Sequence, residues 1–146
     1  MNTEQDSLAL LASINAKAPF NRWCGIEVLA AERGGVELGL NWRVEFGQYS
    51  GFLHAGLIGA LIDTACGFAA ATVVGKVLAS HYSVNCLRPA VGDRFIARAK
   101  VVKAGRSQVF TSAQLYACTA DGEQLVATGE TLLSVVPAAA GDSGGR

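Results

Sequence analysis

The stretch from Gly51 to Gly75 constrains the fold of this chain more than any other. It reads GFLHAGLIGALIDTACGFAAATVVG, with Asp63 as its one formally charged residue and His54 near its start. A helix that is apolar all round is buried all round, so we predict a long helix enclosed by the rest of the fold. A buried carboxylate is unfavourable unless it is hydrogen-bonded or paired. Asp63 therefore either bonds a backbone group of a neighbouring strand or has a function.

The segments around this helix alternate between apolar and polar residues, as half-buried strands do. Two strands are predicted before the helix, over 25–32 and 36–46, joined by a turn at Gly34-Gly35. In the second strand, one face carries Val36, Leu38, Leu40, Trp42, Val44 and Phe46. Four more strands follow the helix, over 77–88, 95–103, 107–118 and 125–136.

The two ends of the chain have different patterns. Residues 3–17 predict a short amphipathic helix, in which Leu8, Leu11 and Ile14 fall at helical spacing and Leu10 widens the apolar stripe. This helix stops before Pro19, and the residues up to Cys24 are expected to form a hydrophobic link into the sheet. Residues 138–146 have no pattern and are expected to be a disordered tail, which leaves 1–137 as one domain.

These elements predict an α+β fold. An antiparallel sheet must bury one face, and a single long helix is available to cover it. A curved antiparallel sheet of about six strands wrapped around the central helix, with a short helix at the amino end, meets both requirements. This arrangement is the hotdog fold.

Composition limits what the chain does. Lysine plus arginine and aspartate plus glutamate both number 12, so the formal net charge is zero, which argues against a nucleic-acid partner. Hydrophobic residues make up 51% and charged residues 16%, so we expect another copy to cover part of the surface. The four cysteines and two histidines have no metal-site spacing, and no glycine-rich nucleotide fingerprint is present. The start lacks a secretory pattern, and Asp63 interrupts the apolar run, so we expect a cytoplasmic protein without a membrane span.

Several short motifs carry a resemblance to one family. They are Gln48, His54-Ala55-Gly56, Asp63-x-x-x-Gly67, Leu87-Arg88-Pro89-Ala90, Gly92-Asp93, Gly105-Arg106 and Ala127-x-Gly129. In their order and spacing, the chain resembles the hotdog-fold acyl-CoA thioesterases of the phenylacetate-degradation (PaaI-like) and 4-hydroxybenzoyl-CoA type. The resemblance implies hydrolysis of a small or medium acyl-CoA or aryl-acyl-CoA to the free acid and CoA, with no cofactor and no metal.

The resemblance also implies roles for the matching residues in catalysis. Asp63 would act as nucleophile or as general base, and these two alternatives stay open. Gln48 would help to place the thioester or the water. The backbone N–H groups of Ala55 and Gly56, next to His54 at the helix start, would polarise the thioester carbonyl. The family has glycine where this chain has Ala55, so the Cβ of Ala55 narrows the approach of the acyl group.

The geometry of one helix separates two of these groups. Ala55 and Asp63 are about 12 Å apart along the helix axis, at 1.5 Å per residue, which one side chain does not span. Either Asp63 meets the helix start of a second copy, or the substrate spans the gap. The resemblance implies a homodimer with two shared active sites, assembled into a homotetramer of either of two arrangements. It places Ser80 near a partner-subunit contact. His81 is a further candidate for substrate contact, and Arg88 and Arg106 for the phosphates of CoA.

Two other functions stay open. One is a non-catalytic hotdog domain that binds acyl-CoA. The other is a dehydratase or hydratase of 3-hydroxyacyl thioesters, although the chain lacks the Gly-His-Phe-Pro motif of those enzymes. Release of free thiol separates the thioesterase from both alternatives.

Overall fold

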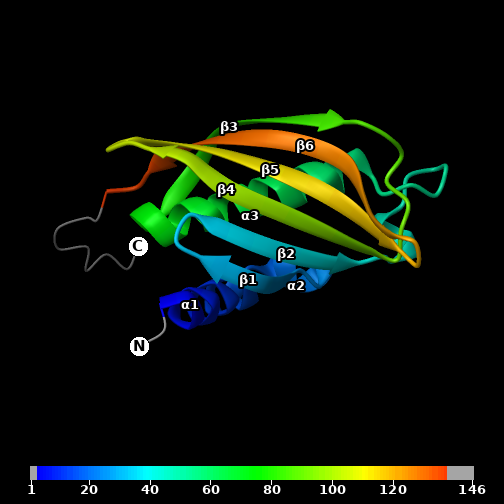
Figure 1. Cartoon of the computed structure of the whole chain (residues 1–146), viewed down its shortest axis with the longest axis horizontal. Helices are drawn as coiled ribbons and strands as arrows, with labels where there is room; N and C mark the ends of the chain where they lie inside the picture. The colour runs from blue at the N-terminus through cyan, green and yellow to red at the C-terminus, as the bar shows by residue number, and fades with distance from the viewer. Residues whose placement is uncertain (1–2, 138–146) are drawn as a thin grey trace.

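The structure, a computed structural model, describes residues 3–137 (Figure 1). Its helices are α1 (Thr3–Lys17), α2 (Pro19–Cys24) and α3 (Ala55–Val74), with a 3₁₀ helix over Val44–Phe46. Its strands are β1 (Glu27–Glu32), β2 (Gly35–Asn41), β3 (Val77–Cys86), β4 (Arg94–Ala104), β5 (Gln108–Thr119) and β6 (Gly122–Val135). The predicted disordered tail lies outside the described residues.

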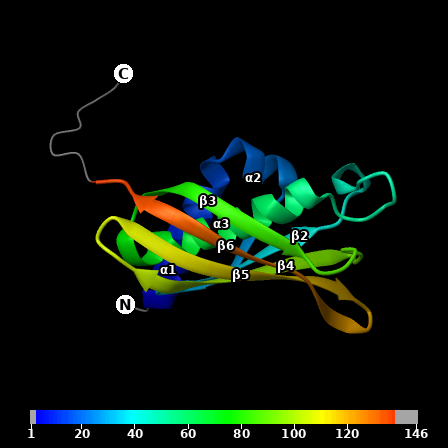
Figure 2. The ribbon, with the colours of Figure 1, turned by 90° about the horizontal axis from the view of Figure 1, so that it is seen from above.

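The strands form one antiparallel sheet in the order β1-β2-β4-β5-β6-β3. The sheet curves around α3, which contacts all six strands. Figure 1 shows β3 along one edge of the sheet and β1 along the other, with α1 and α2 beyond β1. Seen from above in Figure 2, α3 lies between the strands and α2. The predicted hotdog fold is confirmed.

The core lies between the inner face of the sheet and one side of α3. Alternation along the strands turns Leu38, Leu40 and Leu115 inward, where they are fully buried. Gly129 of β6 allows the closest approach in this core. A Cβ there would lie 2.7 Å from Ile62 Cγ2 and 2.7 Å from the carbonyl oxygen of Ser83. Packing therefore explains the glycine of the Ala127-x-Gly129 motif, because any side chain there would push β6 away from α3 and β3.

The central helix differs from the prediction in two ways. It begins at Ala55 rather than Gly51, because Gly51 has a positive φ of 79° and His54 caps the helix. It is also buried on one side only. The opposite side is a half-buried stripe that includes Ala60, Asp63, Thr64, Gly67, Phe68 and Ala71. The curved sheet does not close into a barrel, so the edges β1 and β3 stay apart and leave this stripe uncovered.

The length and apolar composition of α3 also meet the criteria for a membrane span. Core helices of soluble proteins meet the same criteria, and the buried side of α3 packs against the strands of its own sheet.

Two local predictions before α3 are wrong. Residues 19–24, predicted as a hydrophobic link into the sheet, form the short helix α2, because Pro19 suits a first helical turn and Gly25, with φ of 77°, ends it. The strand predicted over 36–46 ends at Asn41. The chain then turns toward α3 through the 3₁₀ helix, which buries Phe46 but leaves Val44 77% exposed. The Arg43 guanidinium stacks 4.2 Å from the Phe46 ring centre and stabilises this turn.

Candidate active site

Asp63 lies on the uncovered stripe near the middle of α3, and its side chain is half-buried. Its Oδ1 atom is buried and has no hydrogen-bond partner among the described residues. Burial raises the pKa of the Asp63 carboxyl above its ordinary value, because the charged form loses hydration. The alternative that Asp63 only bonds a neighbouring strand thus finds no support within residues 3–137. Such a carboxyl is suited to proton transfer or to attack on a carbonyl carbon.

Replacing Asp63 with asparagine is expected to stabilise the fold increasingly as pH rises. The pKa of this carboxyl is higher in the folded chain than in the unfolded chain, so the folded state keeps the proton longer. Stability of the wild type therefore falls as pH rises from the ordinary aspartate pKa through the raised value. Asp63→Asn lacks this fall. Thermal melts of both proteins from acidic to neutral pH measure the difference in Tm, and a difference that does not widen with pH contradicts this expectation.

A groove of about 850 Å³ opens beside Asp63. We call it the Asp63 groove. It lies between α1, α3 and the first residues of β3, and its walls include Leu10, Ile14, Asp63, Phe68, Val77 and Leu133. Along α3 its lining extends from Asp63 toward the carboxyl end of the helix. The one candidate nucleophile on α3 is therefore accessible to a ligand of substrate size.

The amino end of α3 lies in a separate hollow of about 330 Å³, which we call the helix-start hollow. Its lining includes Gln48, Ala55, Cys86 and Arg88. His54 is the N-cap, and its Nδ1 accepts a hydrogen bond of 2.8 Å from the Gly56 N–H. The Ala55 N–H has no acceptor within the described range. Of the two predicted oxyanion donors, the Ala55 N–H is thus the one that is free to bind a substrate oxygen.

Gln48 has a structural contact as well as a place in this hollow. Its Oε1 accepts hydrogen bonds from the backbone N–H groups of Ser50 and Phe52, the latter at 3.4 Å. The amide oxygen thus holds the loop that leads into α3. The NH₂ group makes no hydrogen bond to the part of the chain that the structure describes, so Gln48 can act on a ligand only as a donor.

The two halves of the predicted site do not meet within one chain. Asp63 does not line the helix-start hollow, and neither Gln48 nor Ala55 lines the Asp63 groove. The eight residues from Ala55 to Asp63 span about 12 Å of helix. A reaction that uses the Asp63 carboxyl and the Ala55 N–H together therefore requires a second chain that supplies one of them or a substrate that spans the gap.

The predicted substrate-binding residues are dispersed over the fold. Ser80 and His81 lie at a β-bulge of β3, where the Ser80 hydroxyl is 2.5 Å from that of Ser134 and His81 pairs with Leu132. Leu132 and Ser134 alternate with the inward Leu133, so these residues belong to the outer face, away from α3. Of the two arginines, Arg88 lines the helix-start hollow.

Arg106 follows β4, in the turn before β5, at the opposite end of the sheet from the helix-start hollow (Figure 1). The roles assigned to Ser80, His81, Arg88 and Arg106 stay predictions.

The contribution of α1 and β3 to the surface beside Asp63 was not predicted from the sequence. The Tyr82 ring of β3 packs against Gly59 of α3, one helical turn before Asp63. A Cβ added at Gly59 would lie 3.2 Å from the Tyr82 ring. Leu10 and Ile14 of α1 line the groove itself. A signal was present in the apolar stripe of residues 3–17, which Leu10 makes wider than packing against one strand requires.

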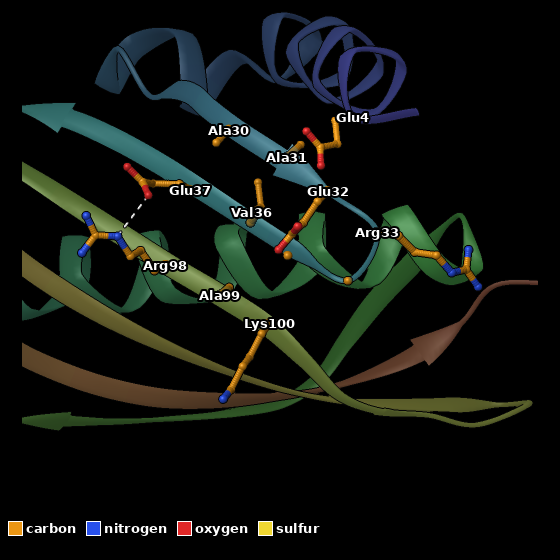
Figure 3. A pocket seen from close by; sticks show the side chains of 12 residues that line it. Glu4, Ala30, Ala31, Glu32, Arg33, Val36, Glu37, Arg98, Ala99 and Lys100 are labelled. Atoms are coloured by element: carbon orange, nitrogen blue, oxygen red, sulfur yellow. Dashed lines mark hydrogen bonds and ion pairs between the residues drawn. The ribbon is translucent and has the colours of Figure 1, made fainter. Parts of the chain in front are cut away.

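A further hollow, of about 360 Å³, lies outside the β1–β2 turn and is shown in Figure 3. Its lining includes the carboxylates of Glu4, Glu32 and Glu37. The Arg98 Nε lies 3.0 Å from Glu37, and its two other nitrogens each lie 2.7 Å from an oxygen of Glu123. These hydrogen bonds hold the pKa of Glu123 below its ordinary value. Arg33, Arg98 and Lys100 line the same hollow, so its acidic and basic side chains are equal in number. Its described lining includes no orphaned carboxyl oxygen like that of Asp63.

Comparison with known proteins identifies related folds. The model of the thioesterase superfamily matches residues 50–120, a range that contains Asp63 and starts just after Gln48. A thioesterase family protein from Silicibacter pomeroyi is 32% identical to this chain, with a TM-score of 0.87, and the alignment covers 90% of this chain and 99% of that one.

Two less similar structures share the fold. A thioesterase from Haemophilus influenzae is 23% identical, with a TM-score of 0.80, and the alignment covers 92% of this chain and 93% of that one. Zebrafish thioesterase superfamily member 2 is 21% identical, with a TM-score of 0.77, and the alignment covers 93% of this chain and 100% of that one. No curated protein sequence matches.

Proposed function

This chain belongs to the thioesterase superfamily, and from this premise we propose that it hydrolyses acyl-CoA thioesters at a site built around Asp63. The observation that carries the proposal is the orphaned carboxyl oxygen of Asp63 on the open side of the central helix. A carboxyl that is half-buried, unpaired and accessible from a groove is unfavourable for stability and suited to chemistry.

The proposed reaction uses three groups of this chain. The Asp63 carboxylate either attacks the thioester carbon itself or removes a proton from the water that attacks it. The Ala55 N–H, at the positive end of the α3 dipole, stabilises the negative charge that develops on the carbonyl oxygen. The Gln48 NH₂ group orients the thioester or the water. The carbon–sulfur bond breaks and the thiolate takes up a proton as CoA. If water attacked, the acid is released directly. If Asp63 attacked, water then hydrolyses the mixed anhydride between Asp63 and the acyl group, which releases the acid and restores the carboxylate.

A second copy of the chain completes the site in this proposal. β3 is an edge strand of ten residues without Asp, Glu, Lys, Arg or Pro, and its Tyr82 is 50% exposed. Long edge strands without such protection pair readily with other chains. We propose that two copies pair along β3, so that the helix-start hollow of each meets the Asp63 groove of the other. Two such dimers would form the homotetramer.

The proposed substrate is a small or medium acyl-CoA or an aryl-acyl-CoA, as in the phenylacetate-degradation type. Arg88, beside Ala55 in the helix-start hollow, would contact the phosphates of CoA as the bidentate donor that arginine provides. The chemistry requires no cofactor. We propose a cytoplasmic location for the protein, together with its acyl-CoA substrate.

The test is release of free thiol from acetyl-, octanoyl-, palmitoyl- and phenylacetyl-CoA by the purified protein. We expect turnover of at least one of these substrates, by an assembly of two or four chains in solution. Tight binding of acyl-CoA without thiol release would instead indicate the non-catalytic binding domain. Formation of an unsaturated thioester from a 3-hydroxyacyl-CoA, without thiol release, would indicate the dehydratase.

A further inference from the structure

α1 contributes two exposed apolar side chains to the Asp63 groove. Leu10 is 57% exposed and Ile14 is 40% exposed, and residues four positions apart lie on the same face of a helix. Both line the groove, together with Phe68 of α3 and Val77 of β3. One wall is therefore built by a helix that the family motifs of the sequence do not include.

This wall is held rigidly to the sheet. Leu11, between the two groove residues, is buried in the core. The Asn15 side-chain amide donates a 2.7 Å hydrogen bond to the Ile26 carbonyl, and the Asn21 amide donates one of 2.9 Å to Asn15 Oδ1. α1, α2 and the start of β1 are thus fixed together, so Leu10 and Ile14 are preorganised for a ligand.

Charge distinguishes the Asp63 groove from the outer hollow of Figure 3. Among the described residues, Asp63 is the one acidic group on the groove lining, which also carries Lys17 and Lys76. The outer hollow carries three acidic and three basic side chains, those of Glu4, Glu32, Glu37, Arg33, Arg98 and Lys100. The groove, with two basic side chains against one carboxyl and largely apolar walls, therefore suits an anionic thioester with an apolar chain.

The groove is long enough for an extended chain. From Asp63 to Ala71 it follows α3 for about 12 Å, and its volume of about 850 Å³ is within the range of ligand pockets. A thioester carbon held at Asp63 would direct its acyl chain toward the carboxyl end of α3, between Phe68 and α1.

We infer that the Asp63 groove binds the acyl chain of the substrate, and that Leu10 and Ile14 of α1 set the length of apolar chain that is accepted. The inference rests on the proposed function and names the substrate class, an unbranched or aromatic apolar acyl group. The competing occupant of the groove is a segment of a second copy of the chain.

The inference is tested by the affinity of S-alkyl-CoA thioethers, which resist hydrolysis. For ethyl, butyl, octyl and dodecyl chains, calorimetry with the wild type should show binding that tightens about fourfold per methylene, the equivalent of ~0.8 kcal/mol per buried CH₂ group, until the groove is filled. Leu10→Trp should shorten the groove, weakening dodecyl binding by roughly tenfold or more while ethyl binding is unchanged. Ile14→Trp should act in the same direction.

The matched control is Ala12→Trp, which places the same side chain on the exposed side of α1, away from the groove. It should leave the chain-length profile unchanged. The inference is overturned if Leu10→Trp and Ala12→Trp give the same profile, or if wild-type affinity does not depend on chain length. It is also overturned if Leu10→Trp reduces the mass of the assembly without changing the profile, because the groove then holds a second copy.

Failure of the proposed function has a different result. If no acyl-CoA releases thiol but the thioether profile responds to Leu10→Trp as expected, the hydrolase proposal fails and the acyl-binding groove stands. If thiol is released but the profile does not respond, the hydrolase proposal stands and the role of α1 fails.

Discussion

Asp63→Asn is expected to reduce kcat for acyl-CoA hydrolysis by about 10²- to 10⁴-fold, the usual contribution of a catalytic acid or base. The amide has almost the shape of the carboxyl but neither attacks a thioester nor takes a proton from water. Since burial already disfavours the charged carboxyl, the variant should fold at least as well as the wild type. KM is expected to change little, because the wall of the groove is preserved.

The measurement is initial thiol release by both proteins on the best substrate of the panel, with a melting curve for each. Asp121→Asn is a matched control, since this exposed aspartate lies in the β5–β6 turn. It should have wild-type kcat. If Asp63→Asn retains wild-type kcat while folded, Asp63 is not the catalytic group and the mechanism proposed here is wrong.

Ala55→Pro is expected to lower kcat by about 10²- to 10³-fold, the effect of removing one oxyanion-hole donor. Ala55 is the first residue of α3, where proline is well tolerated and its missing N–H breaks no helical hydrogen bond. His54 has φ of −59° and ψ of 135°, a conformation that a residue before proline adopts readily. The substitution therefore removes the free N–H with little change elsewhere.

Ala55→Ser is the control, because it changes the side chain by one oxygen atom and keeps the backbone N–H. It should keep kcat within a few-fold of the wild type, with an unchanged Tm for both variants. Equal losses in Ala55→Pro and Ala55→Ser would show that the side chain at this position matters rather than the N–H. The oxyanion role would then be rejected.

The same two variants test whether the site is shared between chains. In a mixed dimer of Asp63→Asn and Ala55→Pro chains, one site carries both defects and the other carries neither. Random mixing of equal amounts should therefore restore about a quarter of wild-type activity. Separate sites within single chains would give no recovery on mixing.

Most of the fold could be predicted because its elements have strong periodic patterns. The alternation of apolar and polar residues from Val36 and the long, largely apolar stretch to Val74 leave few alternatives for strand or helix. Prediction was wrong where the pattern continued past the physical element. Trp42, Val44 and Phe46 extend the alternation of β2, yet the chain leaves the sheet after Asn41 to reach α3.

Of the residues of the candidate site, only Asp63 could be identified from its own sequence context. A lone carboxylate in an apolar helix identifies Asp63 from sequence, and the resemblance adds Gln48 and Ala55. The hydrogen bond from the Gly56 N–H to His54 Nδ1 could not be predicted, because capping geometry depends on the backbone at the helix start. The contribution of Leu10 and Ile14 was hidden for a similar reason, since an apolar stripe does not reveal which of its residues stay exposed.

The sequence by itself determined the element types, the curved antiparallel sheet around one helix and the presence of one unusual carboxylate, since these follow from local periodicity and the cost of burying charge. Only the tertiary structure decided which side of α3 is open. That depends on where β1 and β3 end relative to one another, a contact between segments far apart in the chain. It also placed Asp63 and Ala55 in different hollows, because the surfaces beside them are built from segments far apart in the chain, α1 and β3 beside Asp63 and the residues around Gln48 and Arg88 beside Ala55.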